Sequence, residues 1–182
     1  MSCAENKVAR PLSPLHFVRQ PDETLNNCEI FRDEINLMMP SKPYRGSCLC
    51  QAVQFSVDEF LPEAGHCHCS MCRKFHGASF ATLASVPLES FHWISGEADL
   101  KGYTAENGTV RTFCNHCGSS LFFSSPQMSA DMIEVALGVF DDDIPLKPDV
   151  HIFVESGANW TDLADDLPKY TAGRDSAIVG QA

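Results

Sequence analysis

Three cysteines fall within six positions of the stretch that runs from residue 66 to residue 77: Cys67, Cys69 and Cys72. Cys67 and Cys69 are two residues apart, so on a strand both sulfurs would leave the same face. Cys72 follows at a spacing that one helical turn can close, with Ser70 as the expected N-cap. Zinc in proteins prefers four ligands in a tetrahedron, and thiolates are among its usual ligands. The stretch therefore predicts a zinc ion with one coordination position left free, an arrangement typical of a catalytic zinc.

A second set of cysteines has the spacing of a structural site. Cys114 and Cys117 form a zinc-knuckle pair, and Gly118 follows them where the backbone would need a left-handed conformation. Such a pair needs two further ligands, and Cys48 and Cys50 supply two sulfurs with matching facing. Four thiolates would close the coordination sphere, so this site is predicted to be structural. The seven cysteines therefore indicate two zinc ions per chain.

Two alternatives to this division remain open. The three-cysteine site could be closed by a histidine, since a set of three cysteines and one histidine is an ordinary structural site. The neighbouring candidates are His66, His68 and His76. His68 lies between two cysteines that share a face, so on a strand it should point away from them. Alternatively, the three cysteines could recruit one cysteine of the knuckle.

An open site of three thiolates favours the chemistry of thiols. Three thiolates leave zinc with a net negative charge, so the ion acidifies a bound water less than it does in hydrolytic sites. A soft centre of this kind can exchange its fourth ligand for an incoming thiolate, held ready to attack a carbonyl carbon. Arg73, beside Cys72, and Lys74 would offset the negative charge and could meet a substrate carboxylate. His68, His76 or a water could supply the proton that the new alkoxide needs.

Bulk properties restrict the setting in which this chemistry would occur. The chain has 182 residues, of which 44% are hydrophobic, enough for one domain with a full core. No apolar run reaches the roughly 18 residues needed to span a bilayer, and no secretory signal is visible at the start. Nine cysteines without an export signal indicate metal binding in a reducing compartment, so we expect a cytoplasmic protein. A net charge of -11 argues against nucleic acid as a partner.

The order of elements predicts a mainly β protein. Residues 1–42 are expected to form an N-terminal extension with room for one helix over 22–39, residues 43–170 a zinc-binding domain, and residues 171–182 a C-terminal tail. Short runs of strand-forming residues cover 52–57, 78–86, 91–94, 100–104, 110–113, 121–124, 132–139 and 150–154. Asn107-Gly108 predicts a tight turn. Asp141 to Asp143 are interpreted as a charged turn, and Trp93 and Trp160 as core or pocket wall.

Three motifs, taken in order, resemble one protein family. They are Gly46-Ser-Cys-Leu-Cys50, Cys67-His-Cys-Ser-Met-Cys-Arg73 with Gly77, and Phe113-Cys-Asn-His-Cys-Gly-Ser119 with Leu121. The chain is similar in these residues to the glutathione-dependent formaldehyde-activating enzymes, a family that includes centromere protein V. The similarity continues through His151-Ile-Phe-Val-Glu-Ser156, Trp160 and Leu167-Pro-Lys-Tyr170, so it covers about residues 43 to 170.

The resemblance implies a fold and a reaction. The fold would be a small zinc-bound β-tent of short antiparallel strands. One zinc would be structural, bound by Cys48, Cys50, Cys114 and Cys117, and the other would lie at the active site, bound by Cys67, Cys69 and Cys72. The family's nominal reaction joins glutathione to formaldehyde, giving S-hydroxymethylglutathione, so the chain is expected to be a carbon–sulfur lyase acting on glutathione or another thiol adduct. Zinc would be the cofactor, and a second copy of the chain is a candidate partner.

Two departures from the family pattern affect this expectation. Gln51 replaces the glycine that usually follows the first cysteine pair, and Gly157-Ala158-Asn159 precedes Trp160 where a basic residue, alanine and proline are common. The second departure leaves the substrate open. The alternative function is a non-catalytic zinc module that binds partners, as in the centromere branch. The absence of a basic region and the negative net charge favour the enzyme.

Overall fold

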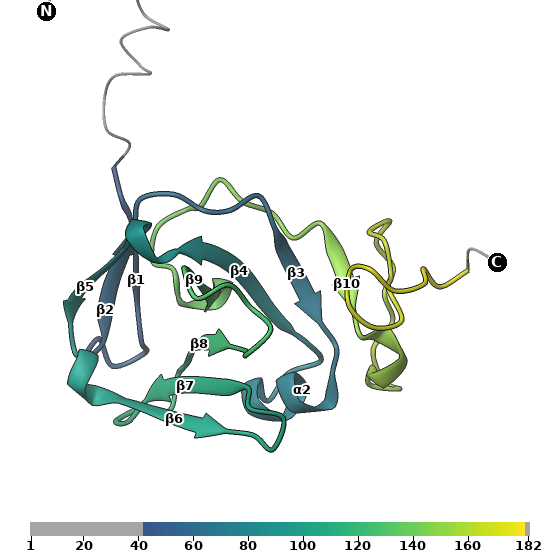
Figure 1. The fold of residues 1–182 in the computed structure, drawn as a ribbon, viewed down its shortest axis with the longest axis horizontal. Coiled ribbons are helices and arrows are strands. Elements are labelled where there is room, and N and C mark those ends of the chain that lie inside the picture. The colour runs from purple at the N-terminus through teal and green to yellow at the C-terminus, as the bar shows by residue number, and fades with distance from the viewer. Residues whose placement is uncertain (1–41, 181–182) are drawn as a thin grey trace, which may run out of the picture. The chain divides into compact units, whose positions relative to one another are not determined.

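The computed structural model describes residues 42–180, and the predicted helix at 22–39, with Cys3 and Cys28, lies outside this range. Within it the chain is mainly β, as predicted, with ten strands and one α-helix (Figure 1). The strands are β1 (Tyr44–Ser47), β2 (Gln54–Val57), β3 (Ala64–Cys67), β4 (Ala81–Pro87), β5 (Phe91–Ser95), β6 (Leu100–Thr104), β7 (Val110–Cys114), β8 (Ser120–Ser124), β9 (Met132–Ala136) and β10 (Val150–Ile152). The helix is α2 (Ser70–His76).

Three strands form a small antiparallel sheet in the order β1-β2-β5. Gly46 on β1 pairs with Phe55 on β2, and a Cβ at position 46 would collide with the Phe55 ring. Phe55 is fully buried and packs its ring against Phe91 and Phe122. The glycine of the first motif is therefore explained by packing, because only a residue without a side chain lets the Phe55 ring cross the strand.

The other seven strands form one sheet in the order β10-β3-β4-β9-β8-β7-β6. All its neighbouring pairs are antiparallel except β10 and β3, which run parallel and place Ile152 opposite Cys67. The turn predicted at Asn107-Gly108 joins β6 to β7, with Gly108 at φ 80°. The parallel pair matters for the site, because it brings the C-terminal part of the domain beside the three-cysteine stretch (Figure 1).

The buried side chains form two clusters. The larger contains Phe55, Leu121 and Val135 together with Cys48 and Cys114, and Trp93 packs against it as predicted. The smaller contains Cys67, Cys72 and Leu83. Each cysteine set is thus part of its own core cluster. Trp160, in contrast, was predicted in the core or a pocket wall but is 69% exposed, because it lies in the irregular segment after β10, which packs few large side chains inward.

Most predicted strands lie within a residue or two of those observed. The run 132–139 is shorter than predicted, because β9 ends at Ala136 and Leu137–Val139 form a 3₁₀ turn. Asp141 and Asp142 form the predicted charged turn: Asp141 accepts a hydrogen bond from the Ser47 hydroxyl (3.0 Å) and Asp142 from the backbone N–H of Arg45 (2.9 Å). The turn therefore anchors β1.

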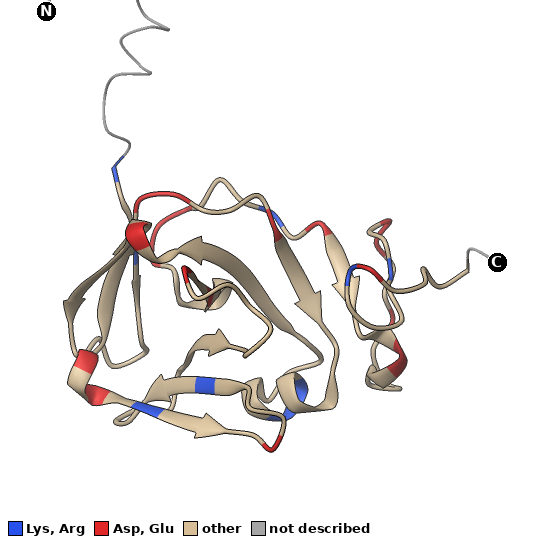
Figure 2. Cartoon of the chain, viewed as in Figure 1, with Lys and Arg blue, Asp and Glu red and all other residues tan. Residues whose placement is uncertain are grey.

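Charged residues are distributed unevenly over the described part of the chain. Acidic residues occupy many loops and outer ends of elements, whereas basic residues are sparse and lie partly on β7 and α2 (Figure 2). No helix in residues 42–180 is long and apolar enough to cross a membrane.

The backbone conformation of Gln51 should lower the stability of the domain, and a substitution can test this. It adopts φ 61°, the left-handed region, in the turn that its N–H closes onto the carbonyl of Cys48 (2.8 Å). A side chain in this region costs roughly 1–2 kcal/mol relative to glycine. We expect Gln51→Gly to raise the free energy of unfolding by about 1 kcal/mol, partly offset by the greater freedom of glycine in the unfolded chain. Denaturant titration measures the free energy of unfolding. Gln51→Ala is the matched control and should not raise the free energy of unfolding. A Gln51→Gly variant less stable than the wild type would contradict the interpretation.

Candidate metal centre and active site

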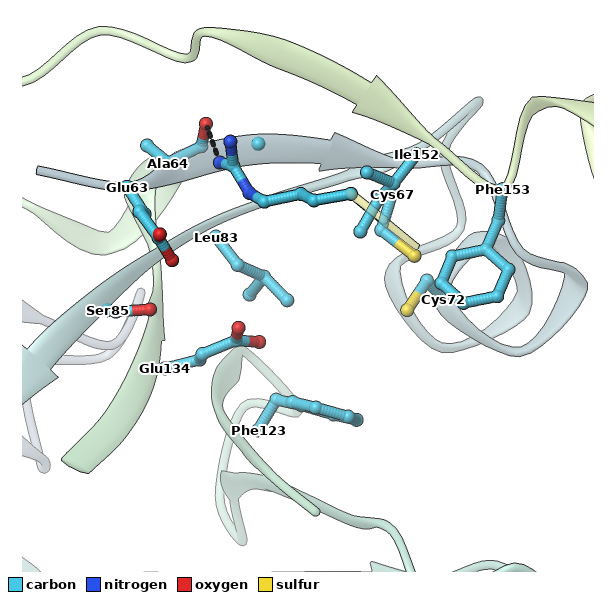
Figure 3. Close-up of a pocket in the computed structure, with 12 residues that line it drawn as sticks. Glu63, Ala64, Cys67, Cys72, Leu83, Ser85, Phe123, Glu134, Ile152 and Phe153 are labelled. Atoms are coloured by element: carbon cyan, nitrogen blue, oxygen red, sulfur yellow. Dashed lines mark hydrogen bonds between the residues drawn. The ribbon is translucent and has the colours of Figure 1, made fainter. Parts of the chain in front are cut away.

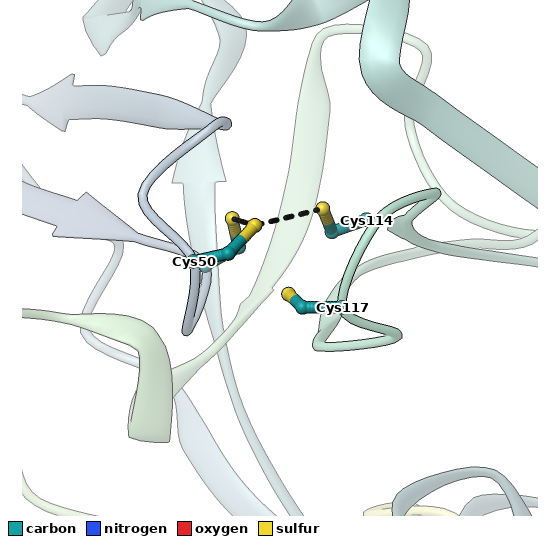
Figure 4. A group of neighbouring side chains, drawn as sticks. Cys50, Cys114 and Cys117 are labelled. Carbon is teal, nitrogen blue, oxygen red and sulfur yellow. Dashed lines mark hydrogen bonds between the residues drawn. The ribbon is translucent and has the colours of Figure 1, made fainter.

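The first cysteine set joins the two sheets. Cys48 and Cys50 lie in the loop between β1 and β2, Cys114 ends β7, and Cys117 follows in the turn, with all four sulfurs within 4.8 Å of one another (Figure 4). The Sγ atoms of Cys48 and Cys50 are 3.5 Å apart, and those of Cys50 and Cys114 are 3.8 Å apart. Gly118 has φ 76°, as the knuckle spacing predicted. Four converging thiols suit a tetrahedral ion that fixes strands distant in sequence.

The second set converges at the end of β3. The sulfurs of Cys67, Cys69 and Cys72 also lie within 4.8 Å of one another. Cys67 is the last residue of β3, whereas Cys69 is the N-cap of α2 and its sulfur accepts a hydrogen bond from the N–H of Cys72 (3.3 Å). Two local expectations are therefore wrong: Cys69 is not on the strand, and the cap is Cys69 rather than Ser70. The strand ends earlier because the chain must turn into the helix to bring Cys72 back.

In residues 42–180, no histidine nitrogen or carboxylate oxygen joins the three sulfurs. His66 instead contacts the Thr82 hydroxyl through Nδ1 (2.9 Å). The Nε2 of His68 contacts Nδ1 of His151 (2.8 Å), whose Nε2 contacts Asp165 (2.9 Å). Burial lowers the pKa of His68 to about 4, so the buried ring is neutral. The alternative of a site closed by a neighbouring histidine finds no support in this geometry.

A buried arginine faces the second set. Arg111 on β7 is only 4% exposed, and its Nη2 lies 3.9 Å from the Sγ of Cys72. Its Nη1 donates to the Thr109 hydroxyl (2.8 Å) and its guanidinium lies 5.1 Å from the centre of the Phe123 ring. Among the described residues it has no carboxylate partner. Contacts with Cys67 and Arg111 lower the pKa of Cys72, but the neighbouring Cys69 and burial raise it, and the pKa stays above its usual value. A buried cation still needs a compensating anion, which the cysteine cluster as a whole can supply.

The thiols of this set also influence one another. Hydrogen bonding of the Cys69 sulfur with Cys67 and Cys72 lowers the pKa of Cys69. Hydrogen bonding of the Cys67 sulfur with Cys69 and Cys72 raises the pKa of Cys67. Cys69 is therefore the first to ionise. Clustered thiols with one ionised sulfur and an adjacent guanidinium fit a soft divalent cation, and none of the seven described cysteines forms a disulfide. Both sets could hold a metal ion, and their all-sulfur donors are those that zinc accepts.

A cavity of about 150 Å³ borders the second set. Cys67, Cys72 and Phe153 lie at one end, and Glu63 and Glu134 lie toward the other (Figure 3). Arg174 also lines it, but its guanidinium is engaged by Asp149 (2.7 and 2.9 Å) and by the Ala64 carbonyl (3.0 Å). Cys67 and Cys72 of the three-cysteine set thus line a cavity. In the other set Cys48 and Cys114 are buried in the main core, whereas Cys50 is exposed and Cys117 half-buried at the surface.

Arg73, predicted at the active site, does not line this cavity. Its Nε donates to the His68 carbonyl (3.3 Å) and its Nη2 to the Ser156 carbonyl (2.9 Å). These bonds tie α2 to the segment after β10. Its role in catalysis stays a prediction, and the geometry is that of a positioning residue.

Three residues at the site were not found from the sequence. Arg111 and Glu134 lie in runs that read as ordinary strands, and only strand pairing brings them to the cysteines. Phe153 has φ 57°, unusual for a bulky residue, and such strain clusters at functional sites. The motif around His151 was the one signal that this segment approaches the site.

Comparison with known proteins agrees with the three motifs. Residues 43–156 match the sequence profile of the family described as glutathione-dependent formaldehyde-activating enzyme. A Halomonas elongata protein named after this family is 29% identical over 127 residues, which is 65% of this chain and 79% of that protein. A Schizosaccharomyces pombe protein described as an uncharacterized lyase is 28% identical over 81 residues, 44% of this chain and 57% of its own length.

Among solved structures, a Rhodobacter sphaeroides protein matches 56% of this chain and 91% of its own, with 26% identity and a TM-score of 0.47. The profile match extends from the segment before β1 through β10 to Ser156, and it includes both cysteine sets. The chain belongs to the glutathione-dependent formaldehyde-activating enzyme family.

Proposed function

We propose that the protein is a zinc-dependent carbon–sulfur lyase that makes or breaks the bond between a thiol, glutathione in the first instance, and a small aldehyde such as formaldehyde. One observation carries the proposal. The three-cysteine set borders a cavity, and no fourth protein ligand joins it among residues 42–180. The family name and that of the yeast relative support the same reaction class.

The residues assigned to the two ions follow the geometry. Cys48, Cys50, Cys114 and Cys117 would hold a structural zinc, and Cys67, Cys69 and Cys72 a second one. When bound there, zinc would lower the pKa of an incoming thiol and hold its sulfur as a thiolate. Arg111 offsets the charge of the cluster beside Cys72. The Phe153 ring lies near Cys67 and Cys72 at the same end of the cavity (Figure 3).

The cavity is large enough for only part of the proposed substrate. Its volume of about 150 Å³ is below the roughly 300–1,000 Å³ of pockets that enclose drug-sized ligands. The cavity would therefore hold the aldehyde carbon and oxygen, while the rest of a peptide thiol stays outside. A second hollow of about 430 Å³ beside α2 carries Lys74 and Arg111 with the Phe75 and Tyr103 rings, and would suit its carboxylates.

The setting of the reaction is part of the proposal. Reduced thiols and a thiol substrate suit the cytoplasm, where thiols are kept reduced. The net charge of -11 supports small molecules rather than nucleic acid as partners.

Because formaldehyde and glutathione also combine without a catalyst, the test measures exchange. With ¹³C-formaldehyde and glutathione, NMR exchange spectroscopy gives the rate of interconversion between free and adduct carbon. The zinc-loaded protein should raise this rate at least about tenfold over buffer, and Cys69→Ser should abolish the increase. A rate equal to that in buffer would contradict the proposed function and favour a zinc-stabilised binding module.

A further inference from the structure

Of the two carboxyls that line the cavity without a hydrogen bond or ion pair in residues 42–180, Glu63 is exposed and Glu134 is half-buried. Glu134 lies on β9, and its side chain points into the cavity toward the end where Cys67 and Cys72 lie (Figure 3). Within residues 42–180, no hydrogen-bond donor contacts its carboxyl oxygens, whereas Asp149 and Asp165 are each engaged by a cation or an imidazole. A half-buried carboxyl that makes no hydrogen bond and faces the cavity is available to a ligand there.

Strand register fixes Glu134 at this place. β9 pairs with β4 so that Glu134 is opposite Ser85, and β4 pairs with β3 so that Ala81 is opposite Cys67. Glu134 and Cys67 are therefore on the same seven-stranded sheet, separated along β4 by the row that contains Leu83. Cys67, Leu83 and Glu134 line the same cavity, so a small group bound to a sulfur at the cysteine end would face the carboxyl within it.

We propose that Glu134 is the catalytic acid that protonates the oxygen of the aldehyde as the carbon–sulfur bond forms. This inference rests on the proposed function. The reaction needs a proton donor at the cavity, and Glu134 would supply it. Neither His68, which hydrogen bonds to His151, nor His76 lines the cavity.

The step balances with the groups named. The thiol first loses its proton to solvent on binding. Its sulfur then supplies the electron pair of the new S–C bond, and the π pair of the C=O bond moves to the oxygen. Glu134 transfers its proton to that oxygen, which becomes the hydroxyl of the S-hydroxymethyl product, and the remaining carboxylate takes a proton from water. In the reverse reaction the carboxylate removes the hydroxyl proton and the S–C bond breaks.

The protonation state of Glu134 suits this task. Burial raises the pKa of Glu134 to about 7, with Arg174 acting in the opposite direction and Glu63 in the same one. An acid with a pKa near the working pH both holds its proton and releases it. The titratable and charged groups that face it across the cavity are Glu63 before β3, Cys67 on β3, Cys72 on α2, and Arg174, which is paired with Asp149, while β4 and β8 contribute Leu83, Ser85 and Phe123.

Glu134→Gln tests the role, since glutamine keeps the shape and cannot transfer an acidic proton. We expect it to lower kcat/KM for adduct formation by about 100-fold and to remove the decline of the wild-type rate above about pH 7. Infrared spectra should show a protonated carboxyl band in the wild type that titrates near pH 7 and is absent from the variant. Zinc content should be unchanged.

The matched control is Glu89→Gln, an exposed carboxyl in the turn after β4 that does not line the cavity, which should keep its rate within about threefold. Glu134→Asp should be faster than Glu134→Gln and should again show the decline of the rate at alkaline pH. This result would distinguish proton transfer from a packing effect. An active wild type with an equally active Glu134→Gln, or one that keeps the alkaline decline, would overturn the inference and leave the proposed function standing. A wild type that does not accelerate exchange would overturn both.

Discussion

Cys114→Ser is expected to prevent the β domain from folding. Cys114 is fully buried in the main core, and its sulfur belongs to the set that joins the loop after β1 to the turn after β7. Structural zinc contributes on the order of 10–16 kcal/mol in zinc-finger peptides, which is as large as the about 5–15 kcal/mol that stabilises a typical domain. Circular dichroism and zinc analysis should show an unfolded chain that has lost both ions.

Asn115→Ser provides the matched control for this variant, because Asn115 is exposed in the same turn and its side chain makes no hydrogen bond in the described part of the chain. It should fold and bind zinc as the wild type does. A Cys114→Ser protein that unfolds cooperatively at a midpoint near that of the wild type would show that the four-cysteine set is not a structural metal site.

Cys69→Ser should have a different result: one zinc lost, the fold intact and the activity gone. Cys69 is partly exposed, and the N-cap hydrogen bond that its sulfur accepts can be accepted by a serine hydroxyl. We therefore expect α2 to persist, with the exchanged N-cap itself changing the free energy of unfolding by only about 1 kcal/mol. The lost ion lowers the free energy of unfolding further, but the four-cysteine set keeps the domain folded. The exchange rate should fall to that of the uncatalysed reaction, at least about tenfold below the wild type.

Ser70→Ala is the control for Cys69→Ser, since Ser70 is the exposed neighbour and is not the N-cap. It should retain both ions and full activity. Global unfolding of Cys69→Ser would indicate that the three-cysteine set is structural instead.

Cysteine spacing predicted more of this molecule than hydrophobic pattern did. Because four thiolates close a tetrahedron and three do not, the spacing favoured the two cysteine sets that the structure brings together, with recruitment of a knuckle cysteine by the other set left as an alternative. This division also implied long-range contacts between the loop after β1 and the turn after β7. Local alternation gave most strands, and β6 was predicted at its observed bounds.

What the sequence did not reveal depends on pairing between distant strands. The parallel contact of β10 with β3, which brings Phe153 to Cys67, has no local signal in so short a strand. Glu134 lies in a run whose neighbours suggest a buried strand, and only its place opposite β4 directs it into the cavity. Arg111 on β7 likewise lies in an ordinary strand run, and only strand pairing brings it to the cysteines. The left-handed backbone at Gln51 was also not predicted, because a residue other than glycine rarely adopts this conformation.

The central claim is that the three-cysteine zinc accepts a sulfur from outside the protein, and X-ray absorption at the zinc edge tests it most directly. For protein loaded with two zinc ions, we predict an average of about 3.5 sulfur ligands per zinc, rising to about four when glutathione is added. Cys69→Ser should show about four sulfurs on its single ion, with no change on adding glutathione. A wild-type average of about four before glutathione is added, or one that glutathione leaves unchanged, would contradict the account.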